Sequence, residues 1–184
     1  MAARISSLWD FSGPAMTISA EENSVFRALE IAQMMLADKT VDAVVITAVD
    51  LAGSPEQVLL RKRKSPLNSG KATLSFDQDV NGWMIGEGAG TVVLKCIENA
   101  KKDQEQIYAT LESVAFSNGI SAKSVEDAAK DALKKAKLKS EEIGILEVFG
   151  SGNEVEDKVE MSGLSSVYCG KNSSCAIGGI KANL

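Results

Sequence analysis

FDQDVNGWMIGEGAGTVVLK, residues 76–95, is the stretch that decides the fold of this chain. Its glycines permit positive φ angles and let one backbone segment pack against another, because glycine has no Cβ. Residues 91–94 are apolar and mostly β-branched, which predicts a short buried strand. The stretch is therefore interpreted as a tight scaffold turn that leads straight into the core.

On the N-terminal side of this stretch, a helix and a strand precede a surface segment. Apolar residues at helical spacing predict an amphipathic helix over residues 23–38. The apolar run 43–48 predicts a buried parallel strand that is covered on both faces. Residues 54–73 combine proline, serine, glycine and a basic run, and predict a surface excursion.

The C-terminal side repeats the alternation of strands and helices. Residues 107–116 alternate in the manner of a strand, and residues 144–149 predict a third buried strand. Ser124, followed by Asp127, resembles a capping box at the start of an amphipathic helix. A further helix is expected to begin near Glu154.

The last motif, residues 178–181, predicts a tight glycine-rich turn. The alternation of strands and helices along the whole chain predicts an α/β layered fold with a mostly parallel sheet.

Composition excludes several classes of function. A length of 184 residues suits one domain or part of a larger one, and 45% hydrophobic residues are ordinary for a globular protein. The net charge of −5 argues against a nucleic-acid partner. No segment approaches the roughly 20 apolar residues of a membrane span. We therefore expect a cytoplasmic protein with no membrane partner.

The cysteines and the basic run are both interpreted as structurally ordinary. Cys96, Cys169 and Cys175 have neither zinc-site spacing nor an even count, so we expect free thiols and no metal site. The basic run at residues 61–64 has no interleaved aromatic residue, and we expect a solvated loop.

Residues 13–24, GPAMTISAEENS, form the second informative stretch. It is expected to leave a short apolar strand and enter a helix, where an α/β enzyme often displays its nucleophile. Glu22 occupies that place, and no Ser, Cys or Thr stands there. The whole chain also contains no histidine. Together these features suggest an enzyme scaffold that lacks the usual catalytic groups.

Four motifs, in the right order, resemble one enzyme family. Residues 76–95 closely resemble the PFDxxxxGxxxGEGAGxxVL signature of β-ketoacyl synthases, the condensing enzymes of fatty-acid and polyketide synthesis. Residues 4–14 resemble the RISY…DLxGPS lead-in to the active-site elbow of that family. Residues 147–153 resemble EAHGTGT, and residues 177–184 resemble IGSxKSNLGH, cut off before its Gly-His.

The chain differs from the family pattern at two positions that hold catalytic residues in the family. The alignment puts Glu22 at the acylated Cys of DTACSSS and Phe149 at the first catalytic His, while the family lysine is retained as Lys181. A thiolate at a helix N-terminus attacks the acyl thioester in this chemistry, and glutamate cannot serve as the exchangeable thiol. Phe149 can neither donate a hydrogen bond nor carry charge.

Each of these three residues also has a structural interpretation. Glu22 is interpreted as a filler that stabilises a helix N-terminus, or as a residue that decarboxylates malonyl groups. Some ketosynthase-like domains with Gln at that position do so, but those domains keep their histidines. Phe149 is expected to pack in the core, and Lys181 to belong to a polar network or to take part in catalysis.

The resemblance implies a thiolase-like fold with layers α-β-α-β-α, of which this chain would be an interior fragment. Residues 1–97 would form the end of the N-terminal half and residues 98–184 the start of the C-terminal half. The sequence of residues 9–15 and 19–24 looks most like that of the chain-length-factor domain of bacterial polyunsaturated (omega-3) fatty-acid synthases.

The function implied by this resemblance is non-catalytic support of acyl-chain condensation. The implied partners are an active ketosynthase in a heterodimer-like pair, or a second copy, and an acyl carrier protein. Substrates would arrive on the phosphopantetheine of that carrier, and no cofactor would bind directly. The alternatives are a malonyl-carrier-protein decarboxylase, a ketosynthase (acyltransferase) fragment that acts only with its partner, and a stand-alone interaction module.

Overall fold

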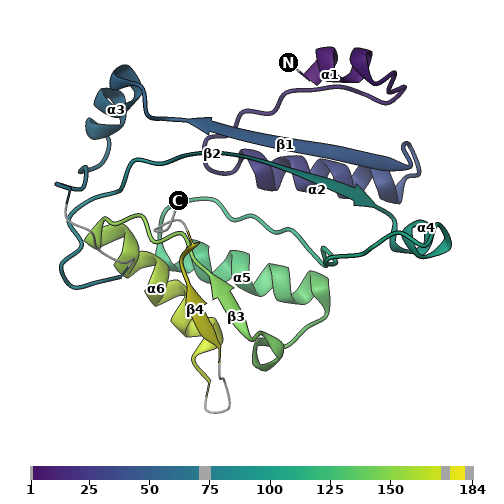
Figure 1. Cartoon of the computed structure of the whole chain (residues 1–184). Helices are drawn as coiled ribbons and strands as arrows, with labels where there is room; N and C mark the ends of the chain where they lie inside the picture. Colours follow the sequence, from purple (N-terminus) through teal and green to yellow (C-terminus); the bar gives the residue numbers. More distant parts are fainter. Residues whose placement is uncertain (1, 71–75, 171–174, 181–184) are drawn as a thin grey trace. The chain divides into compact units, whose positions relative to one another are not determined.

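The computed structural model describes residues 2–70, 76–170 and 175–180 of the chain. The chain forms two compact units: residues 1–49 with 89–114, and residues 50–88 with 115–184. Figure 1 labels the elements in chain order: α1 (Ala2–Leu8), α2 (Ser24–Ala37), β1 (Ala43–Leu51), α3 (Pro55–Lys62), β2 (Glu87–Lys95), α4 (Ile97–Lys102), α5 (Ala122–Ala136), the 3₁₀ turn η1 (Ser140–Glu142), β3 (Ile145–Glu147), α6 (Glu154–Tyr168) and β4 (Ala176–Gly178).

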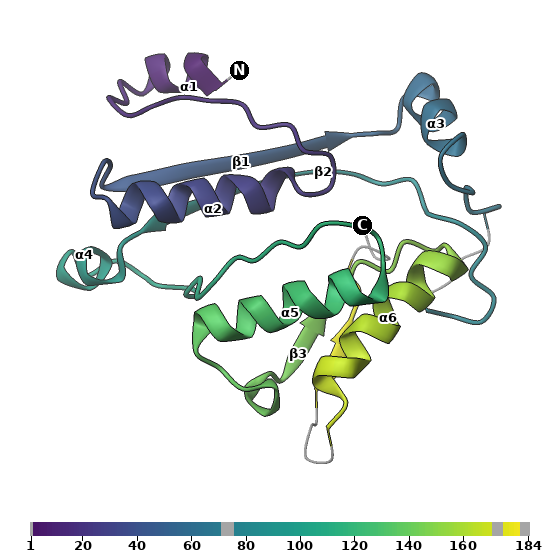
Figure 2. The same cartoon turned by 180° about the vertical axis from the view of Figure 1, so that it is seen from behind.

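The first unit is built around the strand pair β1–β2 and the helix α2. The two arrows point in opposite directions, and α2 runs along the same axis (Figures 1 and 2). The Oγ1 atoms of Thr47 and Thr91 lie 2.9 Å apart, so these residues share one face of the pair. The buried residues of this unit include Ala32 of α2 and Ile46 of β1.

One face of the β1–β2 pair is apolar and uncovered. Side chains alternate along a strand, so Val45 and Val49 lie on the same face as Thr47. They are 45% and 55% exposed, and Val93 of β2 is 66% exposed. The prediction of a parallel β1 covered on both faces is therefore wrong, although the strand itself is confirmed. A β-branched run predicts a strand but carries no information about the direction of its neighbour.

The second unit contains a parallel pair and a tight helix crossing. Leu146 of β3 lies opposite Ile177 of β4 in a parallel register, which agrees with the general expectation of a mostly parallel sheet, although no strand was predicted at the position of β4. Helices α5 and α6 cross closely at Gly163. A Cβ on Gly163 would lie 2.6 Å from both the carbonyl oxygen of Ala122 and the Cβ of Val125. The absence of a side chain at this glycine therefore sets how closely the two helices approach.

The predicted helices 23–38 and near Glu154 are confirmed as α2 and α6, whereas the predicted strand at 107–116 is wrong. Residues 107–116 run as an irregular segment. A strand requires a ladder of backbone hydrogen bonds with a neighbour, and alternation within one segment does not supply that neighbour. Residues 14–19, before the elbow, likewise form no strand.

The helix cap predicted at Ser124 belongs to Ser121. The Ser121 Oγ accepts a hydrogen bond from the Ser124 N–H at 3.2 Å, and α5 begins at Ala122. The Ser124 hydroxyl instead donates to the Asn118 carbonyl oxygen at 2.9 Å. Ser121 has the extended backbone of an N-cap residue, and Ser124 lies within the helix, so the predicted cap position was three residues too late.

Three short helices were not predicted. They are α1, α4 and α3, and α3 lies within the expected surface excursion. Ser54 caps α3 and Pro55 occupies its first position, which are signals that the sequence does contain. The predicted closing turn begins within β4, and Lys181 lies outside the described residues.

Within the described ranges, no helix combines the length and the apolar character needed to cross a membrane. Cys96, Cys169 and Cys175 are free thiols, as predicted. No cluster of three or more His, Cys, Asp or Glu side chains in the described part of the chain is placed to hold a metal ion.

Candidate functional site

The elbow is a tight turn whose strained residue is Glu21. Its φ of 50° lies in the left-handed region, which is uncommon for a residue with a side chain. The Ser24 hydroxyl donates to the Glu21 carbonyl oxygen at 2.6 Å. The same oxygen atom of Ser24 accepts from the Ala20 N–H at 2.9 Å. Ser24 therefore holds both sides of the turn that contains Glu22.

Glu22 lies immediately before the N-terminus of α2, on an exposed part of the turn. The N-cap residue, Asn23, makes no side-chain capping bond. A carboxylate beside a helix N-terminus is stabilised by the helix dipole, by about 0.3–1 kcal/mol. This place would favour a thiolate for the same reason, but a carboxylate cannot exchange an acyl group as a thiol does.

The loop after β3 is held by a carboxylate from α6. Glu160 accepts hydrogen bonds from the Phe149 N–H at 2.7 Å and from the Gly150 N–H at 2.9 Å, one on each oxygen. Because both amides are occupied by a protein carboxylate, neither is free to stabilise a developing negative charge on a bound molecule. The loop therefore has a fixed shape, and these two amides do not form an available donor pair.

Phe149 is 44% exposed, so the prediction that it packs in the core is wrong. The buried apolar residue at this strand end is its neighbour Val148, which is 5% exposed and whose N–H donates to the Gly178 carbonyl oxygen at 2.9 Å. Successive side chains of an extended segment point to opposite sides. Val148 therefore faces the interior of the second unit, and Phe149 faces away from it.

A second carboxylate, Asp157, supports the same loop from the first turns of α6. Asp157 is 5% exposed and accepts a hydrogen bond from the Ser151 hydroxyl at 3.2 Å on one oxygen. The Ser151 oxygen in turn accepts from the Asn153 N–H at 3.1 Å. The Asn153 side chain then caps α6 by accepting from the Val155 N–H at 3.0 Å. Gly150, Ser151 and Asn153 are thus each hydrogen-bonded to a residue of α6.

The glycine-rich stretch that decides the fold contacts this loop directly. Gly152 has a φ of 80°, and a Cβ on it would lie 2.4 Å from the Gly82 carbonyl oxygen. Gly82, with a φ of 138°, is itself in contact with the Leu67 and Asn68 backbone. Two motifs that are 70 residues apart in the numbering therefore meet backbone to backbone, as the sequence predicted for the first of them.

Glu147 links the loop to the segment that leads to Lys181. Its carboxylate accepts a hydrogen bond from the Ile180 N–H at 2.7 Å. Lys181 itself lies outside the described residues, so its predicted roles stay predictions. Glu147, Asp157 and Glu160 are positioning residues that the sequence analysis did not single out. The sequence contains no local signal for the role of Glu160, because the two amides that it binds lie 10 and 11 residues earlier in the chain.

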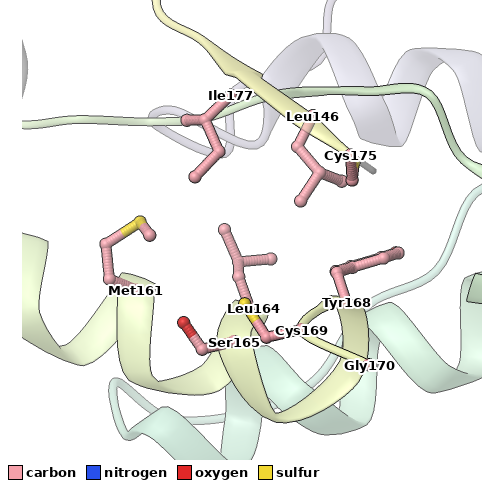
Figure 3. Close-up of a pocket in the computed structure, with 9 residues that line it drawn as sticks. All are labelled: Leu146, Met161, Leu164, Ser165, Tyr168, Cys169, Gly170, Cys175 and Ile177. Atoms are coloured by element: carbon pink, nitrogen blue, oxygen red, sulfur yellow. The ribbon is translucent and has the colours of Figure 1, made fainter. Parts of the chain in front are cut away.

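The second unit also contains an apolar cavity of about 280 Å³ between α6 and the β3–β4 pair. In Figure 3, Leu146 and Ile177 project from the strands toward Met161, Leu164 and Tyr168 of the helix. Burial, and secondarily Cys175, raises the pKa of the Tyr168 hydroxyl, which stays protonated at neutral pH. The cavity is an incompletely filled helix–sheet contact that is lined mainly by apolar side chains.

The predicted site residues are thus distributed over both units. Glu22 belongs to the first unit and Phe149 to the second. Neither has a histidine beside it, since the chain contains none. What each unit does contain is a backbone turn of defined shape, held by Ser24 in one unit and by Glu160 in the other.

Known structures share this architecture over almost the whole chain. The keto synthase–chain length factor of PfaC is 40% identical with a TM-score of 0.87, and the match covers 98% of this chain and 19% of that one. The ketosynthase from module 6 of the bacillaene synthase of Bacillus subtilis is 30% identical with a TM-score of 0.90, covering 99% and 35%. The fold is therefore that of part of a thiolase-like ketosynthase.

Sequence relatives agree with the structural ones. A polyunsaturated fatty acid synthase polypeptide of Thraustochytrium sp. is 36% identical over 80% of this chain and 7% of its own length. Polyketide synthase PksL of Bacillus subtilis is 31% identical over 100% of this chain and 4% of its own length. The chain thus spans only a small part of these much longer proteins.

Two family models match successive parts of the chain. They describe the β-ketoacyl synthase N-terminal domain, matched by residues 1–100, and the β-ketoacyl synthase C-terminal domain, matched by residues 108–184. The chain belongs to the β-ketoacyl synthase family. The predicted division at residues 97 and 98 stays a prediction, and the two compact units each draw on both sides of it.

Proposed function

We propose that this chain is part of a non-catalytic, chain-length-factor-like ketosynthase domain that supports acyl-chain condensation in polyunsaturated fatty-acid or polyketide synthesis. The observation that carries the proposal is Glu22. It stands beside the N-terminus of α2, where the family places its acylated thiol, on an elbow that Ser24 still holds in a tight turn. The scaffold of the nucleophile is kept and the nucleophile is replaced.

The second loop supports the same proposal. Phe149 replaces an imidazole, while the carboxylate of Glu160 fixes the backbone on which it stands. Losing one preorganised hydrogen-bond donor typically costs about 10²–10³ in rate, and losing the thiol removes the covalent route altogether. We therefore assign the chemistry to a partner ketosynthase, with substrates delivered on the phosphopantetheine of an acyl carrier protein.

A malonyl decarboxylase is the alternative that these contacts weigh against. Decarboxylation requires donors that stabilise the enolate as CO₂ leaves. The Phe149 and Gly150 amides are already bonded to Glu160. Glu22 and Glu21 are both acids, and a carboxylate beside a developing enolate opposes its negative charge.

The test uses the synthase protein that contains this chain, with malonyl and acyl carrier substrates. With its ketosynthase partner present, the expected product is a lengthened acyl chain, and Glu22→Ala leaves the condensation rate within about twofold because Glu22 takes no part in bond formation. Glu21→Ala is the matched control one residue away. Condensation or CO₂ release without the partner that disappears in Glu22→Ala but persists in Glu21→Ala would overturn the proposal.

A further inference from the structure

Two asparagine–glycine pairs occur in the chain, at residues 81–82 and 118–119. In such a pair, the backbone nitrogen of the glycine can attack the side-chain carbonyl carbon of the asparagine, because the missing Cβ leaves that approach open. The reaction requires a side chain that can rotate and a backbone nitrogen that is not engaged. The two pairs differ in their surroundings in a way that bears on both requirements.

The first pair is held on both sides. The Asn81 side chain accepts a hydrogen bond from the Ser69 N–H at 3.2 Å and donates one to the Ser69 hydroxyl oxygen at 3.1 Å. Gly82 is buried, and a Cβ on it would lie 2.4 Å from the Leu67 carbonyl carbon. Ring closure at this pair therefore requires two hydrogen bonds to break and a crowded backbone to rotate.

The second pair is exposed and its reacting groups are not engaged. Asn118 and Gly119 are both exposed, and the next residue, Ile120, is 96% exposed. Among the residues that the structure describes, neither the Asn118 side-chain amide nor the Gly119 N–H makes a hydrogen bond. A Cβ on Gly119 would lie 3.0 Å from the Ser124 oxygen, the end of a flexible side chain. Ring closure at this pair therefore breaks no hydrogen bond of either reacting group.

We propose that Asn118 is a site of spontaneous deamidation in the folded protein, with water as the only co-reactant. Hydroxide removes the proton from the Gly119 nitrogen, which then forms a bond to the side-chain carbonyl carbon of Asn118. The bond from that carbon to the side-chain nitrogen breaks, and the nitrogen leaves as ammonia after taking a proton from water, which restores the hydroxide. Water then breaks one of the two C–N bonds of the cyclic imide, and the new carboxyl group loses its proton at neutral pH.

The two possible products differ in their main chain. Hydrolysis at the former side-chain carbonyl gives aspartate, which keeps the normal main chain. Hydrolysis at the former main-chain carbonyl gives isoaspartate, in which the chain runs through the former side chain and is one carbon longer. Both products add one negative charge to an exposed loop, and the modified fraction grows with the age of the protein because no enzyme is required.

Isoaspartate is the product that reaches beyond the loop. The Asn118 carbonyl oxygen accepts a hydrogen bond from the Ser124 hydroxyl at 2.9 Å, and the Ser124 oxygen lies 2.9 Å from that of Ser121, the cap of α5. In isoaspartate this carbonyl becomes a free carboxylate on a displaced main chain, so the anchor of the first turn is lost. That turn contains Ala122, whose carbonyl oxygen lies at the close approach to Gly163. The modification is therefore expected to loosen the α5–α6 crossing.

The experiment incubates the synthase protein that contains this chain at physiological temperature and neutral pH, and follows both pairs by peptide mass spectrometry. Conversion of the amide to an acid adds about one dalton to the peptide. Asn118 is expected to convert at least about tenfold faster than Asn81, because local opening must precede the reaction at Asn81. A more alkaline buffer should speed the conversion of Asn118, since hydroxide removes the Gly119 proton.

A synthetic peptide of residues 114–123 is the positive control, because it contains the same pair without the fold. Equal rates at Asn81 and Asn118 in the protein would overturn the proposal, since the fold would then not discriminate between the pairs. An unmodified Asn118 after an incubation that converts the peptide fully would overturn it as well, because the fold or another part of the synthase would then protect the pair.

Two variants separate the site from its surroundings. Asn118→Gln lengthens the side chain by one carbon, which disfavours ring closure, and should remove the isoaspartate that an isoaspartyl methyltransferase labels in aged protein. Undiminished labelling would assign the isoaspartate to another residue and overturn the proposal. Ser69→Ala removes one of the two hydrogen bonds of Asn81 and should speed its conversion several-fold, with Asn118 unchanged.

Asn118→Asp tests which product loosens α5. This variant has the added charge on a normal main chain, and hydrogen exchange in the first turn of α5 should match that of the unaged protein. Aged protein that contains isoaspartate should exchange several-fold faster there. Equal acceleration in both would mean that charge loosens the turn, and would overturn the assignment of the effect to the longer main chain.

Discussion

A Cβ on Gly152 would lie 2.4 Å from the carbonyl oxygen of Gly82. Real Cβ atoms do not approach a carbonyl oxygen so closely, and the obstacle is backbone rather than a flexible side chain. This contact joins the glycine-rich stretch that decides the fold to the loop that contains Phe149. The loop therefore depends for its position on a glycine in a different motif.

Gly152→Ala should destabilise the protein by about 2–4 kcal/mol, since it combines a backbone clash with a left-handed φ of 80°. Chemical denaturation monitored by Trp83 fluorescence measures the loss. Gly90→Ala is the control, because nothing lies within 4 Å of a Cβ at that position. If both variants lost the same stability, the Gly82–Gly152 approach would have no special role.

Glu160→Gln should loosen the Phe149 loop while leaving α6 in place. The carboxylate accepts two amide hydrogen bonds, and the neutral amide of glutamine replaces one acceptor by a donor. The expected cost is about 1–3 kcal/mol, because at least one amide loses its partner. Hydrogen exchange of the Phe149 and Gly150 amides reports the change directly.

The control for Glu160→Gln is Glu156→Gln, an exposed position one turn earlier on α6. It should leave the exchange of both loop amides unchanged. Equal acceleration in the two variants would mean that removing any charge from α6 loosens the loop, and would remove the specific role of Glu160.

Local patterns predicted the three longer helices well, but they missed the three short helices and predicted the sheet poorly. Helices α2 and α6 begin within one residue of the predicted starts, because helical periodicity and polar caps are encoded within the segment itself. The direction of β1 and the absence of a strand at residues 107–116 depend on neighbouring segments. A strand needs hydrogen bonds to a neighbouring strand, and the composition of one segment does not specify which neighbour it will have.

The candidate site was likewise predictable from the sequence only in part. Glu22 and Phe149 could be found from the sequence because each replaces a residue type that the resembling motifs specify. Glu160 could not, since its role is to bind two amides 10 and 11 residues earlier, a relation that requires the turn between β3 and α6. Exposure of Phe149 was missed because an apolar residue at a strand end is usually buried.

Ser24→Ala tests whether the elbow is held by the two bonds of one hydroxyl. The variant leaves the Ala20 N–H without its acceptor and removes the donor to the Glu21 carbonyl oxygen. We expect a loss of about 1–2 kcal/mol in unfolding free energy, because Glu21 must keep its left-handed conformation without that support. Ser19→Ala, an exposed serine in the same segment, should be close to neutral.

The Glu22→Cys variant tests whether the first unit still provides the environment of a reactive thiol. A thiol beside the N-terminus of α2 should have a lowered pKa, since the helix dipole favours the thiolate. Alkylation by iodoacetamide at neutral pH should be faster than at Glu21→Cys, one residue further from the helix, by up to about tenfold for one unit of pKa. Peptide mass spectrometry separates this modification from that of Cys169, the exposed natural thiol.

Condensation by the Glu22→Cys variant should still be absent, because Phe149 cannot stabilise the enolate that forms as CO₂ leaves. Equal alkylation at positions 21 and 22 would contradict the idea that the elbow retains the geometry of a nucleophile site. Condensation by Glu22→Cys alone would show that the missing imidazole is not needed, and would assign the loss of chemistry to Glu22 by itself.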